Sequence, residues 1–589
     1  MRRHFFSTLS YNHVLLGIVL LAFSLFLGCA KQGYPTGGPK DVDAPKVMKV
    51  SPPNESVQFV GNQFFIGFDE YVVLKDASNN VLVSPPMDPK PEFLPKGHGL
   101  LVKLRDTLQS NTTYLFQFKE AIADFNEGNL LPSFEYVLST GSAIDSMQLR
   151  GQIVDALTLL PRKEVVTVLL FDPRIDLTLL SLSDSLAKAK NSLDIPLAPL
   201  YQTRANKKGF FQFNYIKPGS YRLLALEDGN KNFRLEQSEP FAFYDNLVKA
   251  EPMVLQPNDS IAAISGRYIT EDTTTVIATA NMLKMSEPKD TKQRVTNTEF
   301  LQKGRAFITT HLPMQEPDLK SLGDEIYWKL SASRDTIHLW TRREQMDSLR
   351  LVLYDATGIQ DTMKIRYRAP KAKAKPYGVQ SNIKITNNFS SSFAYFDTLK
   401  LYFEVPVMMK DPNASAAAIC LSADSTLHDT VVITLKEHEI NNFSGAITAY
   451  MNWQPKAGEK YTITLLPNVF QDIYGHTNDS AVWKTEVTTA EKYGILSLKL
   501  SHGADIENCM IELLDEKGNT LQRRPGQEVM RFEHLKAGKY RIRAFVDANH
   551  NGKWDAGDFQ NQQQPEAVYY FEKVLDIREN WEFEERWSF

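Results

Sequence analysis

The 589-residue chain is expected to be all-β, built as a tandem series of β-sandwich domains. Three observations predict this class. Apolar and polar residues alternate with period two in short runs such as 64–68, 114–118, 166–171 and 221–226. Turn residues such as those at 52–54 and 217–219 separate the runs at short spacing. Two long segments also occur twice, which indicates repeated domains.

The first 28 residues differ from the rest of the chain. Arg2, Arg3 and His4 give a positive start, residues 14–27 are almost entirely apolar, and Gly28-Cys29 follows. This is the pattern of a secretory signal peptide. It resembles the lipobox read by lipoprotein signal peptidase, although Phe26 and Leu27 depart from the usual residues. The resemblance implies cleavage before Cys29 and a covalent lipid on it. The alternative is an uncleaved anchor helix.

Residues 29–46 are rich in Gly, Pro, Lys and Asp, so they are expected to form a flexible tether. Extended at ~3 Å per residue, it would hold the first domain up to roughly 50 Å from the bilayer. The net charge of −4 is small and spread out, which argues against a nucleic-acid partner. Cys420 and Cys509 fall in different expected domains and apolar stretches, so buried thiols are favoured over a disulfide.

The first repeat pairs residues 47–142 with residues 378–490. Residues 67–72 resemble 402–407, the turns before Tyr114 and Tyr461 correspond, and a turn at Asp124 or Asp472 follows. These residues resemble the bacterial Ig-like family of surface-layer proteins, in which a Phe-Asp/Ser-Glu strand precedes Leu-x-x-Asn-Thr-x-Tyr and Asp-x-x-Gly-Asn turns. The resemblance implies an Ig-like sandwich in each copy, degenerate in the second, and is almost silent on activity.

The second repeat aligns residues 219–239 with residues 538–558 without gaps. An upstream Phe-x-Phe strand is matched by residues 530–532, and a Gly-x-Tyr-x-Leu/Ile strand follows in both copies. This pattern resembles the carboxypeptidase-regulatory, transthyretin-like β-sandwich. That family is mostly an appended, non-catalytic module, so the resemblance implies a structural role.

The repeats predict the domain organisation. The only helix expected is an insertion at 181–193, and the basic, proline-bearing stretch 369–376 is expected to be a solvated hinge, with contact to an acidic surface as the alternative. The expected divisions are a signal peptide (1–28), a lipidated tether (29–46), an Ig-like domain (47–142), a transthyretin-like domain (143–258), an unassigned β domain (259–370), a second Ig-like domain (371–492) and a second transthyretin-like domain (493–589).

The best candidate for chemistry is the loop at 547–558. A calcium loop needs oxygen ligands at positions 1, 3, 5, 9 and 12, a carbonyl at 7 and glycine at 6. Gly552 supplies the turn, and Asp558 replaces the usual glutamate with a shorter reach. The alternative is a metal-free polar turn closed by Asx side chains. The expected ligands are Asp547, Asn549, Asn551, Asp555 and Asp558, with the carbonyl of Lys553.

The first copy of this loop is a weaker calcium candidate. Phe233 stands where the second copy has Gly552, and a phenylalanine at a position that prefers positive φ is costly. The oxygen-bearing residues of this copy are Asp228, Asn230, Asn232, Glu236 and Glu239.

No enzyme signature is present: the sequence lacks His-Glu-x-x-His, Gly-x-Ser-x-Gly, a phosphate loop and Cys-x-x-Cys. His98, His338 and His438 stand alone. A hydrolase with a cryptic carboxylate pair, such as Asp69-Glu70, is one alternative. Glycan binding on exposed aromatics is another, although tryptophans in β-sandwiches are more often core residues. The tryptophans are Trp328, Trp340, Trp453, Trp483, Trp554, Trp581 and Trp587.

The C-terminal residues 581–589 alternate and predict a last strand, which either closes its own sandwich or offers an edge to a partner. The whole arrangement, including the tether sequence at 33–41, resembles Ig-like outer-membrane lipoproteins of Bacteroidota. The resemblance implies a non-enzymatic scaffold, anchored to the outer membrane by its lipid and bound to an envelope protein partner. Neither the partner nor the side of the membrane follows from the sequence.

Overall fold

The computed structural model describes residues 41–191, 193, 195–253, 267–268, 281–288, 292–302, 304–343, 348–356, 360–367, 382–389, 391–411, 418–422, 428–436, 439–441, 443–501 and 506–589. They form paired β-sheets with short helical turns, so the all-β expectation is confirmed. Within these ranges no helix is long and apolar enough to cross a bilayer. The expected signal peptide, Cys29, the 369–376 hinge and His438 lie outside the described residues.

The first module, residues 47–139, packs a four-stranded sheet (β1, β2, β6 and β5) against the strands β9, β7 and β4 around aromatic side chains that include Phe64, Phe116 and Tyr136. The chain is fixed from residue 41, because Asn129 Nδ2 donates to the carbonyls of Asp41 and Asp43. The helix α2 is Ala77–Asn80, and the strands are β1 (Val47–Ser51), β2 (Gln63–Phe68), β3 (Val72–Leu74), β4 (Val81–Ser84), β5 (Glu92–Pro95), β6 (Gly99–Lys103), β7 (Thr113–Phe118), β8 (Ile122–Asp124) and β9 (Phe134–Ser139).

The second module includes strands on both sides of the expected boundary at 258, since β19 pairs with β10. Two later segments return to earlier sheets: β18 (Arg267–Tyr268) pairs with β9, and β19 (Met282–Met285) lies parallel to β10. The expected helix is present in shorter form as α3 (Asp184–Lys190) after the 3₁₀ turn η1 (Leu177–Ser181). The other strands are β10 (Met147–Asp155), β11 (Thr167–Phe171), β12 (Tyr201–Arg204), β13 (Phe210–Ile216), β14 (Ser220–Leu226), β15 (Phe241–Phe243), β16 (Val248–Lys249) and β17 (Glu251–Pro252).

The third and fourth modules cover residues 292–367 and 382–488. The third contains β20 (Val295–Gln302), β21 (Arg305–Thr310), β22 (Asp318–Ser321), β23 (Ile326–Leu330), β24 (Thr336–Thr341), β25 (Ser348–Tyr354) and β26 (Gln360–Arg366). The fourth contains β27 (Ile385–Asn387), β28 (Ser391–Phe393), β29 (Lys400–Met409), β30 (Ala418–Ser422), β31 (His428–Leu435), β32 (Ala446–Asn452), β33 (Lys460–Leu465), β34 (Phe470–Asp472) and β35 (Ala481–Val487).

The fifth module, residues 490–589, ends in a strand that closes its own sandwich, since β43 lies parallel to β36. This pairing repeats that of β19 with β10 in the second module. The turns η3 (Ala490–Lys492) and η4 (Ile506–Asn508) flank its first strand. The strands are β36 (Gly494–Ser501), β37 (Cys509–Leu514), β38 (Thr520–Pro525), β39 (Val529–Leu535), β40 (Gly538–Val546), β41 (Val568–Tyr570), β42 (Leu575–Ile577) and β43 (Glu582–Ser588).

The sequence repeats are structural repeats. In the first module Val72 pairs with Asp124, and in the fourth Val407 pairs with Asp472, the register that the alignment requires. In the second and fifth modules the hydroxyls of Tyr221 and Tyr540 donate to the carbonyls of Lys217 and Lys536, at 2.6 and 2.8 Å. Each repeated tyrosine therefore fixes the turn before its own strand.

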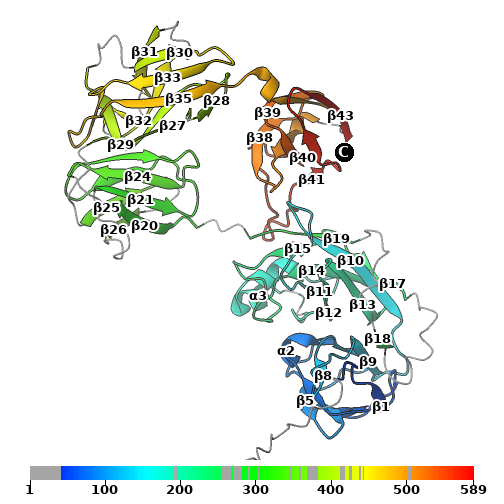
Figure 1. The fold of residues 1–589 in the computed structure, drawn as a ribbon. Coiled ribbons are helices and arrows are strands. Elements are labelled where there is room, and N and C mark those ends of the chain that lie inside the picture. The colour runs from blue at the N-terminus through cyan, green and yellow to red at the C-terminus, as the bar shows by residue number, and fades with distance from the viewer. Residues whose placement is uncertain are drawn as a thin grey trace, which may run out of the picture.

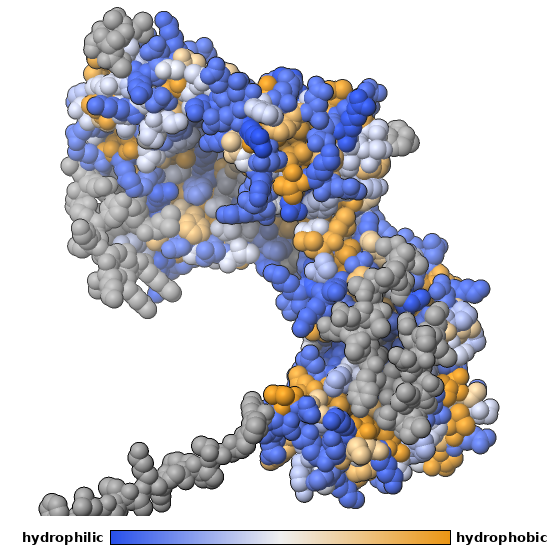
Figure 2. All heavy atoms as spheres, turned by 45° about the vertical axis from the view of Figure 1, so that its right-hand side comes forward, coloured by the Kyte–Doolittle hydropathy of each residue, from blue (hydrophilic) through white to orange (hydrophobic). Residues whose placement is uncertain are grey.

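The modules do not follow one another in space as they do in sequence. Figure 1 shows the third module (green) below the fourth (yellow), the fifth (orange and red) beside the fourth, and the second (cyan) below the fifth. The first module (blue) lies beneath the second. The chain thus leaves the second module, builds the third and fourth, and returns to the second through the fifth, which gives a body hollowed on one side (Figure 2).

Candidate functional site

The loop after β40 is closed by its own side chains. Asp547 accepts the backbone N–H groups of Asn551 (3.0 Å) and Gly552 (2.8 Å). Asp555 Oδ2 accepts from the side-chain amides of Asn549 and Asn551, each at 2.7 Å. Gly552 adopts φ 71°, as the sixth position of a calcium loop requires. The structure therefore brings together Asp547, Asn549, Asn551 and Asp555 of the expected ligand set.

Asp558 does not occupy the closing position that the calcium-loop pattern predicts for it. Its carboxylate accepts from the backbone and side chain of Asn561, at a separate turn. Glu566 takes the closing position instead, accepting the N–H groups of Ala548 at 2.9 Å and Asp555 at 2.8 Å. Burial raises the pKa of Glu566, and the charges of Asp555 and Asp547 raise it further.

The loop after β14 has the same construction. Asp228 accepts from Asn232 N and Phe233 N, and Glu236 accepts from the amides of Asn230 and Asn232. Glu239 accepts the N–H groups of Gly229 and Glu236, which is the role of Glu566 in the later copy. The gapless alignment therefore holds only as far as Asp555. Beyond it the fifth module carries eight additional residues, which the gapless alignment does not contain.

These additional residues join the fifth module to the second. Phe559 lies against Phe241 and Phe243, with ring centroids 5.4 and 5.6 Å away. Gly557 N donates to Ser286 Oγ at 3.0 Å, and Gln564 Nε2 donates to Asp245 at 2.8 Å. We call residues 557–564 the docking loop. The composition of the docking loop does not predict an interface between modules, because one phenylalanine among polar residues is typical of any exposed turn.

The first and second modules meet over a second junction. Tyr215 packs against Leu115 and Val137, and its hydroxyl donates to Glu55. Gln202 donates from its side chain to the carbonyl of Val83 at 2.7 Å. These contacts fix the β12 edge of the second module against β4 of the first.

The repeat uses the corresponding residue for the corresponding junction. His534 occupies the position of Tyr215, and both have positive φ, 58° and 56°. His534 stacks on Phe396 of the fourth module, with centroids 3.9 Å apart, and its Nε2 lies 3.1 Å from the hydroxyl of Tyr395. The second and fifth modules therefore each contact the module before them in the chain through a corresponding residue with a left-handed backbone.

The third and fourth modules are joined through an ion pair and backbone contacts. Lys329 pairs with the buried Glu439, and Trp328 and Asn441 form an isolated β-bridge. The indole of Trp340 donates to the carbonyl of Glu404 at 2.9 Å. The segment without a recognisable motif is thus a β module fastened to its successor.

No cluster of three His, Cys, Asp or Glu side chains able to hold a metal ion occurs among the described residues. Cys420 and Cys509 are buried in separate clusters without a disulfide between them, which confirms that expectation, and burial raises the pKa of the Cys420 thiol to about 12. Of the seven tryptophans only Trp581 is mostly exposed, at 56 %, and other exposed aromatic side chains include Tyr71 and Phe125.

Comparison with known families decides the identity of the first module. The family model described as bacterial Ig-like domain matches residues 41–140. Residues 41–140 are a bacterial Ig-like domain. The match begins at Asp41, where the contacts of Asn129 fix the chain, so the end of the expected tether belongs to the folded domain. No curated protein matches the chain.

Several solved structures match the chain at low sequence identity and low TM-score. The Bacillus anthracis TIE protein is 10 % identical over 97 % of this chain and 78 % of its own, with a TM-score of 0.11. The S-layer protein SbsC is 12 % identical over 85 % and 63 %, with a TM-score of 0.12. The Bacteroides ovatus protein SGBP-B, solved with a mixed-linkage heptasaccharide, is 10 % identical over 72 % and 93 %, with a TM-score of 0.17. Values this low support no statement about function.

Proposed function

We propose that the chain is a non-enzymatic scaffold of the cell envelope, held to the outer membrane by a lipid on Cys29 and bound to an envelope protein partner. The observation that carries the proposal is the docking loop. Through it the fifth module returns to the second, and the modules become one continuous body with fixed junctions. A chain that served only as a flexible spacer would not need this closure.

The chemistry of the described residues supports an interaction role. Acidic side chains such as Asp124, Asp547 and Asp228 accept hydrogen bonds from backbone N–H groups within their own turns. Carboxylates used in this way stabilise loops and are poorly placed to act as general acids or bases. The modules present extended surfaces instead, which suits a scaffold.

The partner is tested by affinity purification from solubilised membranes. We expect one envelope protein to co-purify stoichiometrically with the tagged wild-type chain. The matched variant is Phe559→Asp, which opens the docking loop without touching the lipid anchor, and it should weaken the association. If no protein co-purifies at constant ratio after cross-linking, the scaffold proposal is wrong.

The anchor is tested separately. Metabolic labelling with a palmitate analogue should mark the wild-type chain, whereas Cys29→Ser should remain unlabelled and leave the membrane fraction. Cys420→Ser serves as the control, because that thiol is buried and should not change labelling. Equal labelling of the wild type and Cys29→Ser would overturn the lipoprotein part of the proposal.

A further inference from the structure

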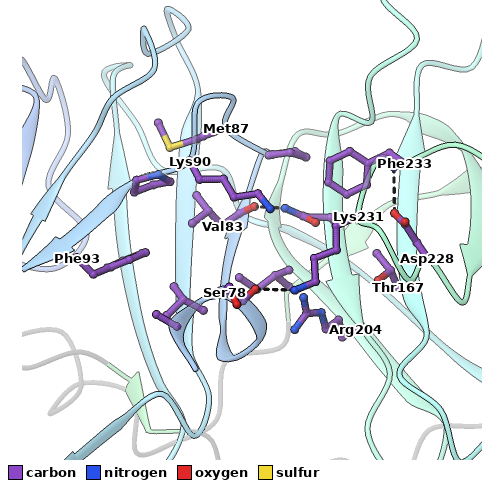
Figure 3. A pocket seen from close by; sticks show the side chains of 16 residues that line it. Ser78, Val83, Met87, Lys90, Phe93, Thr167, Arg204, Asp228, Lys231 and Phe233 are labelled. Carbon is purple, nitrogen blue, oxygen red and sulfur yellow. Dashed lines mark hydrogen bonds between the residues drawn. The ribbon is translucent and has the colours of Figure 1, made fainter. Parts of the chain in front are cut away.

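A cleft of about 250 Å³ lies between the first and second modules (Figure 3). One wall comes from β4 and the segment after it, and the other from β12 and the loop after β14. Val83, Met87, Phe93 and Phe233 give the lining an apolar surface. The cleft is distinct from the docking loop.

Three cationic side chains share this lining: Lys90, Arg204 and Lys231. Lys231 Nζ donates to the carbonyl of Ser78, and Arg204 donates to the carbonyl of Asn79. The Nε atom of Arg204 is buried without a hydrogen-bond partner in the described structure. Burial lowers the pKa of Arg204 and of Lys231, and repulsion from Arg204 and Lys90 lowers that of Lys231 further.

The carboxylates that act on Arg204 and Lys231 already accept hydrogen bonds from other groups. Asp228 accepts from Asn232 N and Phe233 N, and Asp76 accepts from the side chains of Ser78 and Asn79. The lining holds three cationic side chains and one carboxylate, that of Asp228, so positive charge is in excess there. An anionic ligand would neutralise this excess positive charge.

The loop after β14 has diverged from its repeat at the residues that line the cleft. Lys231 and Phe233 stand where the fifth module has His550 and Gly552. Phe233 keeps a left-handed backbone, φ 59°, a conformation that a non-glycine residue disfavours. A costly residue is therefore present where its ring forms part of the cleft wall (Figure 3).

We propose that this cleft binds a small amphipathic anion, with its acidic group at Lys90 and Arg204 and its apolar part against Met87, Phe93 and Phe233. The volume matches about eight waters at ~30 Å³ each, which is room for a chain of about eight carbons. This site is independent of the scaffold role, because its residues contribute nothing to the docking loop.

Octanoate is a suitable probe. Equilibrium dialysis of labelled octanoate against the purified full-length chain should show saturable binding that weakens as salt rises. Lys90→Glu should weaken it at least about fivefold, because the reversed charge would repel the carboxylate of octanoate at the cleft lining. Ala77→Trp should also weaken it, by filling the cleft.

Two controls separate this site from adventitious binding. Lys96→Glu carries the same charge change outside the cleft lining and should bind octanoate as the wild type does. Uncharged 1-octanol should bind the wild type less tightly than octanoate does. Its affinity for Lys90→Glu should equal its affinity for the wild type. Absence of saturable octanoate binding, or equal binding by the wild type and Lys90→Glu, would overturn the proposal without bearing on the scaffold role.

Discussion

At the scale of single residues, Glu512 shows how the fifth module supports a buried charge. Its side chain is fully buried, and it pairs with Arg543 at 2.5 Å and with Arg523 at 2.8 Å. The Thr520 hydroxyl donates to the same carboxylate. Three donors around one buried anion satisfy the hydrogen-bonding capacity that burial would otherwise leave unpaired.

Glu512→Ala should destabilise the fifth module by about 3 kcal/mol, because it leaves Arg543 buried without a counter-ion. Hydrogen exchange measured by mass spectrometry should report the loss in peptides from β37, β38 and β40. Glu516→Ala is the matched control, since its pair with Lys539 is exposed and contributes about 0.5 kcal/mol at most. Equal exchange in the two variants would contradict this reasoning.

Glu566 gives a second prediction at this scale, on pH. Burial and the charges of Asp555 and Asp547 raise the pKa of Glu566 above its usual value of 4.5. Ionising Glu566 therefore costs the folded module more than the unfolded chain. In chelator, the protection factors of residues 547–566, corrected for the intrinsic slowing of amide exchange at lower pH, should rise as the pH falls from 7 through this raised pKa. Glu566→Gln should lose this dependence, and an unchanged profile would show that another group controls it.

At the scale of elements, sequence predicted the repeats well and the loops only in part. The alternation and the repeated Gly-x-Tyr turns depend on local patterns, so the strands around Tyr221 and Tyr540 could be located. The closing acid of the later loop could not be located, because Glu566 follows eight additional residues that the gapless alignment does not contain. Likewise, β19 depends on a parallel pairing that leaves no local signature.

The calcium interpretation stays a prediction, now with a different closing residue. Calcium that binds only the folded chain stabilises it by about 2.7 kcal/mol at a hundredfold excess over Kd. Millimolar calcium should therefore slow hydrogen exchange in residues 547–566 of the wild-type chain. Glu566→Gln should reduce this response, whereas Asp558→Asn should keep it because Asp558 belongs to the neighbouring turn. Identical exchange in calcium and in chelator would leave the metal-free turn.

At the scale of the whole molecule, the junctions explain why domain order in sequence differs from order in space. The second and fifth modules are repeats, yet they meet asymmetrically: the docking loop of one fills a surface of the other formed by Phe241 and Phe243. The asymmetry arises from residues present in only one copy. The two modules share one construction, and the docking loop gives the fifth a contact surface for the second that its repeat does not have.

The docking loop should therefore control whether the chain is closed. In a Ser181→Cys/Gln560→Cys background, a short bis-maleimide should cross-link the second module to the fifth, because the two native side chains are hydrogen-bonded. Adding Phe559→Asp should abolish the cross-link, since a buried carboxylate against Phe241 and Phe243 carries a desolvation cost that no partner offsets. Phe125→Asp, an exposed site on the first module, should leave cross-linking unchanged. Efficient cross-linking of the Phe559→Asp chain would mean that other contacts hold the modules together.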